Sequence, residues 1–329
     1  MEYNTPSQKE ALLNELKGNL FEYLVGQSLA FKKGILPQFY KNFGGQIKNQ
    51  LVEYENWLRK NDPTLFSKLP QLADSLAREL IPHLPDKPDN LLVIGKAGGH
   101  RHSLNEADLL VFKGKRPVPI SVKLCKTKAF VNTKSGGVKS FLVKYFQTFY
   151  QAPLWQTQLN EALKLSFKNM GHELYELEGM DFRGEFDDRW DHSHLPGKVP
   201  AEMRPKILKF YSEVIGEIYE IFLEMYAISP EKLKACLYPI MGFGSKEMIQ
   251  ATCFHGIENG QKYHLKGIKI FTGSSLVHNL KDFKIEKIKK NLSSFEIKAG
   301  ELTLQIRVKP MNIFTTPAVK INCSIKENV

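Results

Sequence analysis

The stretch EADLLVFKGKRPVPISVKLCK, Glu106–Lys126, decides the fold that we expect for this chain. Two apolar runs, ADLLVF and ISVKLCK, lie on either side of KGKRPVP, which predicts two strands joined by a turn. Asp108 opens the first strand, and fourteen residues separate it from Lys123 in the second. Because side chains alternate along a strand, Ser121 and Lys123 share one face. The opposite face, toward a core, carries Ile120, Val122 and Leu124.

Positive charge is concentrated around this stretch. The 329-residue chain has a formal net charge of +11, and residues 109–160 contain nine basic residues and no acidic one. Solvated faces usually mix both signs, so this segment favours a surface that contacts a polyanion, with nucleic acid as the first choice. The nine are Lys113, Lys115, Arg116, Lys123, Lys126, Lys128, Lys134, Lys139 and Lys144.

Several classes of protein are disfavoured by the composition. The four cysteines form no CxxC pair, which is typical of reduced thiols rather than of a disulfide framework or a zinc cluster. No apolar run approaches the roughly 18 residues of a membrane span, and no basic segment followed by an apolar one suggests a signal peptide. We therefore expect a cytoplasmic protein.

Hydrophobic spacing predicts the remaining elements. Helices are expected over residues 7–33, 50–60, 66–84, 138–168 and 201–227, a loop over TKAFVNTKSGG, and irregular structure over 169–199. Period-two patterns after Ser245 predict antiparallel strands. The first helix carries Glu22 between Gly18 and Gly26, which share its face. We expect two regions, residues 1–227 and a β-rich region 228–329, with a boundary weak enough that they could form one domain.

The arrangement of Asp108 and Lys123 suits phosphodiester hydrolysis. This reaction needs a metal ion held by oxygen ligands, a positioned water and a cation near the phosphate. Two adjacent strands can supply them, with an aspartate at the end of one and a lysine on the same side of the next.

These residues resemble the PD-(D/E)XK nuclease superfamily, especially its type II restriction endonucleases. The resemblance rests on Asp108, on the SVK of residues 121–123, and on KGNLFEYL with Glu22 as the preceding helix. It implies an α/β (α+β) fold with a central mixed β-sheet flanked by helices, a restriction-endonuclease-like core, to which the C-terminal antiparallel β region would be added. It also implies Mg²⁺ held by Asp108, Glu22 and the backbone carbonyl of Val122, with Lys123 activating water.

One residue departs from the family pattern. Asp or Glu is expected where this chain has Ser121, whose hydroxyl is a poor ligand for Mg²⁺. Glu22 and Glu106 are both candidates for the acid that completes the catalytic set.

The resemblance further implies a site-specific hydrolase of double-stranded DNA in a bacterium or archaeon. Palindromic sites match a two-fold homodimer, and a cognate DNA methyltransferase would belong to the same restriction–modification system without forming a stable complex. A repair or structure-specific nuclease of the same fold, or a non-catalytic nucleic-acid-binding protein, remains an alternative. The predicted DNA contacts are Lys113, Lys115, Arg116, Lys126, Lys128, Lys134, Lys139, His100, Arg101, His102, Arg307, Lys309 and Asn312.

Two other motifs compete with this site. Asp282 with Glu296-Ile297-Lys298 fits the literal pattern of the superfamily but lies in an amphipathic run typical of a solvated strand. DDRWDHSH, with His192 and His194, has the residue types of a metal site, although a polar surface loop explains it more simply.

Overall fold

A computed structural model describes residues 6–42, 45–94, 107–127, 129–190, 199–243, 247–311 and 313–327. The fold is mixed α and β, as predicted, and contains two five-stranded sheets. It divides into two compact units: residues 1–131 with 242–276, and residues 132–241 with 277–329. The predicted boundary between residues 227 and 228 differs from this division, because residues 249–272 pair with strands of the first unit. In the described part of the chain, no helix is both long and apolar enough to span a membrane.

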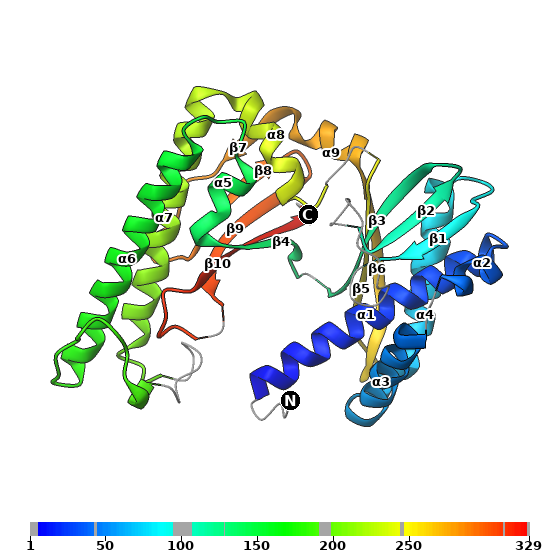
Figure 1. The fold of residues 1–329 in the computed structure, drawn as a ribbon, viewed down its shortest axis with the longest axis horizontal. Coiled ribbons are helices and arrows are strands. Elements are labelled where there is room, and N and C mark those ends of the chain that lie inside the picture. Colours follow the sequence, from blue (N-terminus) through cyan, green and yellow to red (C-terminus); the bar gives the residue numbers. More distant parts are fainter. Residues whose placement is uncertain are drawn as a thin grey trace. The chain divides into compact units, whose positions relative to one another are not determined.

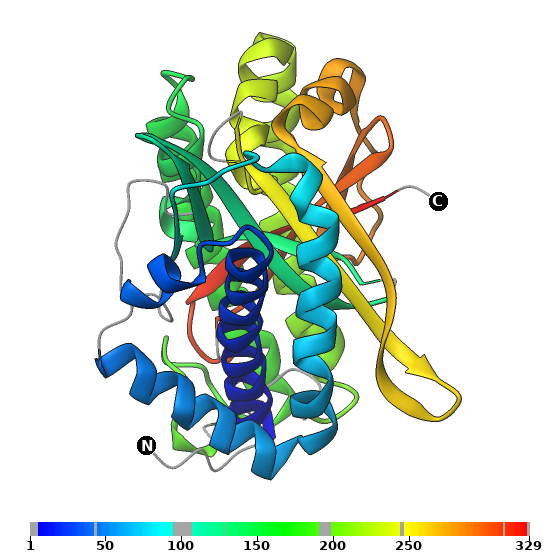
Figure 2. The ribbon, with the colours of Figure 1, turned by 90° about the vertical axis from the view of Figure 1, so that its right-hand side faces the viewer.

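The first unit holds a mixed sheet in the order β1-β2-β3-β5-β6 (Figure 1). Only the β3–β5 pair is parallel; the other three pairs are antiparallel. Helices α1 and α4 lie side by side against one face of this sheet (Figure 2). The elements are α1 (Pro6–Lys32), α2 (Leu36–Lys41), α3 (Gly45–Asn61), α4 (Pro63–Leu80), a 3₁₀ turn (Ile81–His83), β1 (Asn90–Val93), β2 (Leu109–Lys113), β3 (Arg116–Lys126), β5 (Ile249–Glu258) and β6 (Gln261–Thr272).

Alternation along β3 is as predicted. Ile120 and Val122 are buried in the core beneath α1 and α4, and Leu124 packs against that core. Ser121 and Lys123 alternate with these residues, so their side chains leave the strand on its other face.

Helix α1 approaches the sheet closely at Gly26. A Cβ atom there would lie 3.2–3.3 Å from Phe39, Leu91 and Leu109, so even alanine would crowd the contact. This glycine serves close packing, and it sets the distance of Glu22, one turn earlier, from the strands.

The β2–β3 connection is shorter than predicted. Strand β3 already begins at Arg116, and Gly114 takes a left-handed conformation (φ 60°) in the tight turn. Pairing with β5 begins only at Ile120, so Pro117 and Pro119 occupy a part of β3 without a partner on that side. Prolines, which lack an N–H, are tolerated on such an edge.

The second unit holds a sheet in the order β4-β10-β9-β8-β7, with α7 packed against β8 and β9. Its strands β7 to β10 are antiparallel neighbours, as predicted for the C-terminal region. Its elements are β4 (Val131–Gly137), a 3₁₀ turn (Val138–Ser140), α5 (Phe141–Tyr145), α6 (Ala152–Leu177), a 3₁₀ turn (Asp188–Trp190), α7 (Arg204–Ile228), α8 (Pro230–Ile240), a 3₁₀ turn (Leu280–Asp282), β7 (Phe283–Ile285), β8 (Ser294–Ala299), β9 (Leu302–Pro310) and β10 (Val319–Glu327). Helix α9 (Gly273–Asn279) lies where the chain passes between the units.

Three predictions for this unit are wrong. The segment predicted as a loop, TKAFVNTKSGG, contains strand β4, whose pairing with the distant β10 overrides its polar and glycine-rich sequence. The single helix predicted over 138–168 is interrupted at residues 146–151, and α6 starts afresh with Pro153 in its first turn, where no N–H is needed. Helix α6 then continues to Leu177, into the segment predicted to be irregular.

Candidate active site

Asp108 is held at the beginning of β2 by its own main chain. Its N–H donates to the carbonyl of Ile120 on β3 (2.8 Å), and its carbonyl accepts from the N–H of Ile94 next to β1 (2.8 Å). The backbone at this position is therefore fixed from both sides, which orients the carboxylate.

Three donors of β3 converge on one carboxylate oxygen of Asp108. Oδ2 accepts from the backbone N–H of Val122 (2.7 Å), from Nζ of Lys123 (3.1 Å) and from Oγ of Ser121 (3.2 Å). The side chain thus takes the place of a main-chain acceptor and extends the β2–β3 ladder by one bond. The tripeptide SVK and the aspartate form one unit, as the sequence predicts.

The carbonyl of Val122 points toward the same side. Within a strand, the N–H and C=O of one residue point in the same direction, and the N–H of Val122 points to Asp108. A cation bound to Asp108 would therefore find this carbonyl oxygen nearby, as expected for the predicted third ligand.

Glu22 of α1 belongs to the same group of charges. Burial, together with the nearby negative charge of Asp108, raises the pKa of Glu22 well above its ordinary value, against a smaller lowering by Lys123. A buried carboxylate whose charge is disfavoured by a second carboxylate is a common feature of sites that bind a cation.

Lys123 remains a cation in this setting. Burial alone would lower its pKa, but the carboxylates of Asp108 and Glu22 outweigh burial and raise the pKa above the ordinary lysine value. The ion pair with Asp108 is largely shielded from solvent, with 29% of the Lys123 side chain and 19% of the Asp108 side chain exposed.

The donors fit a hard divalent cation, with one deficiency. Two carboxylates and a carbonyl oxygen are the ligand types that Mg²⁺ prefers. However, no group of three or more His, Cys, Asp or Glu side chains suited to a metal occurs among the residues that the structure describes. Ser121 is 4% exposed and its hydroxyl donates a hydrogen bond to Asp108. Because this hydroxyl is neutral, it adds no negative charge to the site. Glu106, the other candidate acid, lies outside the described residues.

Sequence reasoning missed Gln250, which lies beside Ser121. The parallel register of β3 and β5 pairs these two residues directly, so they share a face. Gln250 is 1% exposed, and its Oε1 has no hydrogen-bond partner among the residues that the structure describes. Only a long-range strand pairing reveals this neighbour, and nothing in the local sequence indicates it.

The predicted DNA contacts do not all gather around this site. The β2–β3 turn carries Lys113, Lys115 and Arg116, all exposed, but Arg116 lies seven residues from Lys123, about 23 Å along the strand. Lys126, also exposed, is only three residues away. Lys134 and Lys139 belong to the second unit. Outside the described residues lie His100, Arg101, His102, Lys128 and Asn312.

A cluster of cations lies on the sheet of the second unit. Lys309 on β9 pairs across the ladder with Lys320 on β10, and Arg307 lies two residues away on the same face. Burial lowers the pKa of Lys309, and the neighbouring charges of Lys320 and Arg307 lower it further. Of the predicted contacts, Arg307 and Lys309 are thus adjacent, and Lys320 was not anticipated. Within the described ranges none of the three makes an ion pair, and we call them the β9–β10 cation cluster.

The competing motif at Asp282 is not assembled. The N–H of Glu286 donates to the carbonyl of Glu296, which fixes the β7–β8 register. Asp282 then lies four residues further along the ladder, about 14 Å from Glu296. Lys298 is exposed and 3.8 Å from Glu286 instead. The literal sequence match therefore leaves Asp282 and Glu296 well separated along the β7–β8 ladder.

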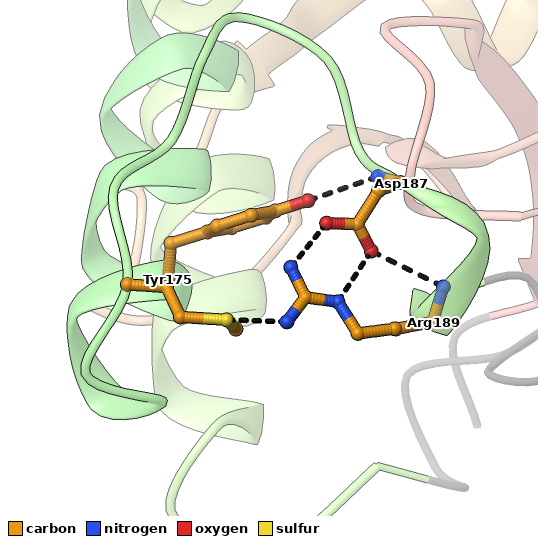
Figure 3. A network of polar contacts seen from close by, with 4 residues as sticks. Tyr175, Asp187 and Arg189 are labelled. Atoms are coloured by element: carbon orange, nitrogen blue, oxygen red, sulfur yellow. Dashed lines mark hydrogen bonds and ion pairs between the residues drawn. The ribbon is translucent and has the colours of Figure 1, made fainter.

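The motif DDRWDHSH contains a structural ion pair. Asp187 accepts from Nε of Arg189 (2.9 Å), and the backbone N–H of Asp187 donates to the hydroxyl of Tyr175 (2.9 Å), as Figure 3 shows. The guanidinium lowers the pKa of Asp187 to about 2. This carboxylate holds a turn, while His192 and His194 lie outside the described residues.

No model of a known protein family matches the chain, and no curated protein or solved structure resembles it at a significant level.

Proposed function

We propose that this protein is a Mg²⁺-dependent endonuclease that cleaves double-stranded DNA at a specific short sequence, in the manner of type II restriction enzymes. The observation that carries the proposal is the convergence of Ser121, Val122 and Lys123 on one oxygen of Asp108, with Glu22 beside them. Two strands and a helix thereby bring together the acid, the carbonyl and the lysine that phosphodiester hydrolysis requires.

In this mechanism Asp108, Glu22 and the carbonyl of Val122 would hold Mg²⁺. Bound there, the ion would polarise the scissile phosphate and lower the pKa of a coordinated water. Lys123 orients the attacking water and offsets the charge that develops on the phosphate. Shielding from solvent strengthens both electrostatic effects.

Contacts with the DNA backbone would come from cations that reach the surface. Lys126 extends β3 beyond the site, and the β9–β10 cation cluster, with Arg307 exposed and Lys309 and Lys320 half-buried, offers three positive charges that form no ion pair within the described residues. Phosphate groups are the partners that such uncompensated cations favour. The sequence specificity, a homodimer, a cognate methyltransferase and a cytoplasmic location in a bacterium or archaeon all belong to this proposal.

The test is incubation of plasmid or phage DNA with the protein in MgCl₂ or in EDTA. Discrete fragments only in MgCl₂ support site-specific cleavage, whereas random nicking supports a repair or structure-specific nuclease. Lys123→Ala should abolish cleavage and keep most DNA binding. Lys298→Ala is the matched control, because that lysine is exposed on β8 in the other motif and should leave cleavage unchanged.

A non-catalytic nucleic-acid-binding protein is the second candidate. It is favoured by Ser121, which stands where the family pattern has an acid, and by the absence of a third clustered carboxylate among the described residues. DNA binding without cleavage in Mg²⁺, Mn²⁺ and Ca²⁺ would support this candidate against the nuclease.

A further inference from the structure

Gln250 carries a buried polar atom for which the described part of the fold supplies no hydrogen bond. Its neighbours on β5, Ile249 and Ala251, lie in the core under the helices, so Gln250 points to the opposite face, beside Ser121. Its Oε1 is buried, and no described residue hydrogen-bonds to it. Leaving such an oxygen unpaired is destabilising, and folded proteins rarely retain one without a reason.

Lys123 on β3 and Lys269 on β6 are the two lysines diagonal to Gln250 on that face, and Lys123 is the one that contacts Asp108. It lies two residues beyond Ser121, so it is the diagonal neighbour of Gln250 across the β3–β5 pair, within reach of a long side chain. In the structure its ammonium is committed to Asp108, 3.1 Å away, on an oxygen that it shares with Ser121 and Val122.

A divalent cation on Asp108 changes this balance. Two positive charges that share one carboxylate repel each other, and they do so strongly where solvent is excluded. The ammonium of Lys123 must then find another acceptor, because a buried charge without a hydrogen bond is costly. Gln250 Oε1 is neutral and buried, it has no hydrogen-bond partner in the described ranges, and Gln250 lies on the same face.

We propose that Gln250 is a positioning residue that accepts the ammonium of Lys123 when a divalent cation occupies Asp108. This inference rests on the proposed nuclease function and adds an exchange to it. The ammonium of Lys123 contacts Asp108, as in the structure, and would move to Gln250 when a cation binds Asp108. The exchange frees Asp108 for the cation and keeps Lys123 fixed next to it. Gln250 thereby provides a neutral acceptor oxygen for Lys123 on β5. It lies next to Ser121, the position where the family pattern has an acid.

Calorimetric titration with MnCl₂ in the absence of DNA tests this exchange. Gln250→Met, of similar length but without an acceptor, should raise the Kd for Mn²⁺ about tenfold. It should also raise the melting temperature in EDTA, because a buried amide oxygen without a hydrogen bond is removed. Gln250→Glu should rescue the Mn²⁺ affinity to at least that of the wild type, because it restores an acceptor. Gln305→Met, on the sheet of the second unit, is the control and should leave the affinity unchanged.

A double-mutant cycle decides whether Gln250 acts through the lysine. In a Lys123→Met background, Gln250→Met should cause no further loss of Mn²⁺ affinity. The exchange is overturned if the losses of Mn²⁺ affinity are additive, or if Gln250→Met binds Mn²⁺ as the wild type does. In either case, DNA cleavage by the wild type would still support the nuclease. A wild-type protein that neither binds Mn²⁺ nor cleaves DNA overturns both proposals.

Discussion

Ser121→Asp restores the acid of the family pattern and should make the stability of the protein depend on metal. Ser121 is buried and its Oγ lies 3.2 Å from Asp108 Oδ2, so a carboxylate here places two negative charges about 4 Å apart. At that distance like charges repel by about 4 kcal/mol in a partly screened site. Lys123, which already neutralises Asp108, should offset about half of this, leaving a net loss of about 2 kcal/mol in the metal-free protein.

Urea denaturation in EDTA and in MnCl₂ measures this effect. A cation bound only by the folded state contributes about 2.7 kcal/mol at one hundred times its Kd, enough to offset the loss. Ser121→Asn introduces a side chain of the same size as Asp but without charge, and it is the control. Its free energy of unfolding should rise in MnCl₂ no more than that of the wild type. If Ser121→Asp is as stable in EDTA as Ser121→Asn, or if Mn²⁺ does not restore it, the carboxylates are not close enough to form a metal site.

Three further predictions concern separate features. Burial and Asp108 raise the pKa of Glu22, so the folded state binds the carboxyl proton of Glu22 more tightly than the unfolded state does. The free energy of unfolding of the metal-free protein should therefore fall as pH rises above the unfolded pKa near 4.5. Glu22→Gln should abolish this fall and be more stable than the wild type at pH 8, as measured by urea denaturation in EDTA. Lys309→Ala should lower the slope of log affinity for DNA against log salt by about 0.9, whereas Lys284→Ala, whose lysine is 3.5 Å from Glu286, should leave it unchanged in fluorescence titrations. Gly171→Ala should destabilise the second unit by about 1–3 kcal/mol by calorimetry, because its Cβ would lie 2.5 Å from the ring of Phe182; an unchanged melting temperature would contradict that contact.

Local patterns in the sequence predicted much of the secondary structure. The helix containing Glu22 and the alternation of β3 follow from spacing of apolar residues within a few turns or positions. Strand β4 was missed because its stability comes from pairing with β10, almost two hundred residues away in the chain. The local sequence VNTKSGG does not by itself favour a strand, so it gives no indication of this pairing.

The candidate site divides in the same way. Asp108, Ser121 and Lys123 lie on adjacent strands of one hairpin, so their approach could be worked out from alternation and turn length. Gln250 could not, because β5 reaches β3 by a parallel pairing after the chain has formed most of the second unit. The opposite error occurs at the β2–β3 turn. Lys113, Lys115 and Arg116 are close to Lys123 in sequence, but the extended strand β3 holds them far from it in space.

The discontinuity of the first unit has a consequence for synthesis. Its chain leaves at residue 131 and returns at residue 242, so a ribosome completes α6, α7 and α8 before β5 exists. Until then β3 is an open edge, and such edges recruit other chains. Pro117 and Pro119 protect only its first half. We therefore expect nascent chains ending before β5 to depend on chaperones, and the site to form late, when the strand that carries Gln250 closes the sheet.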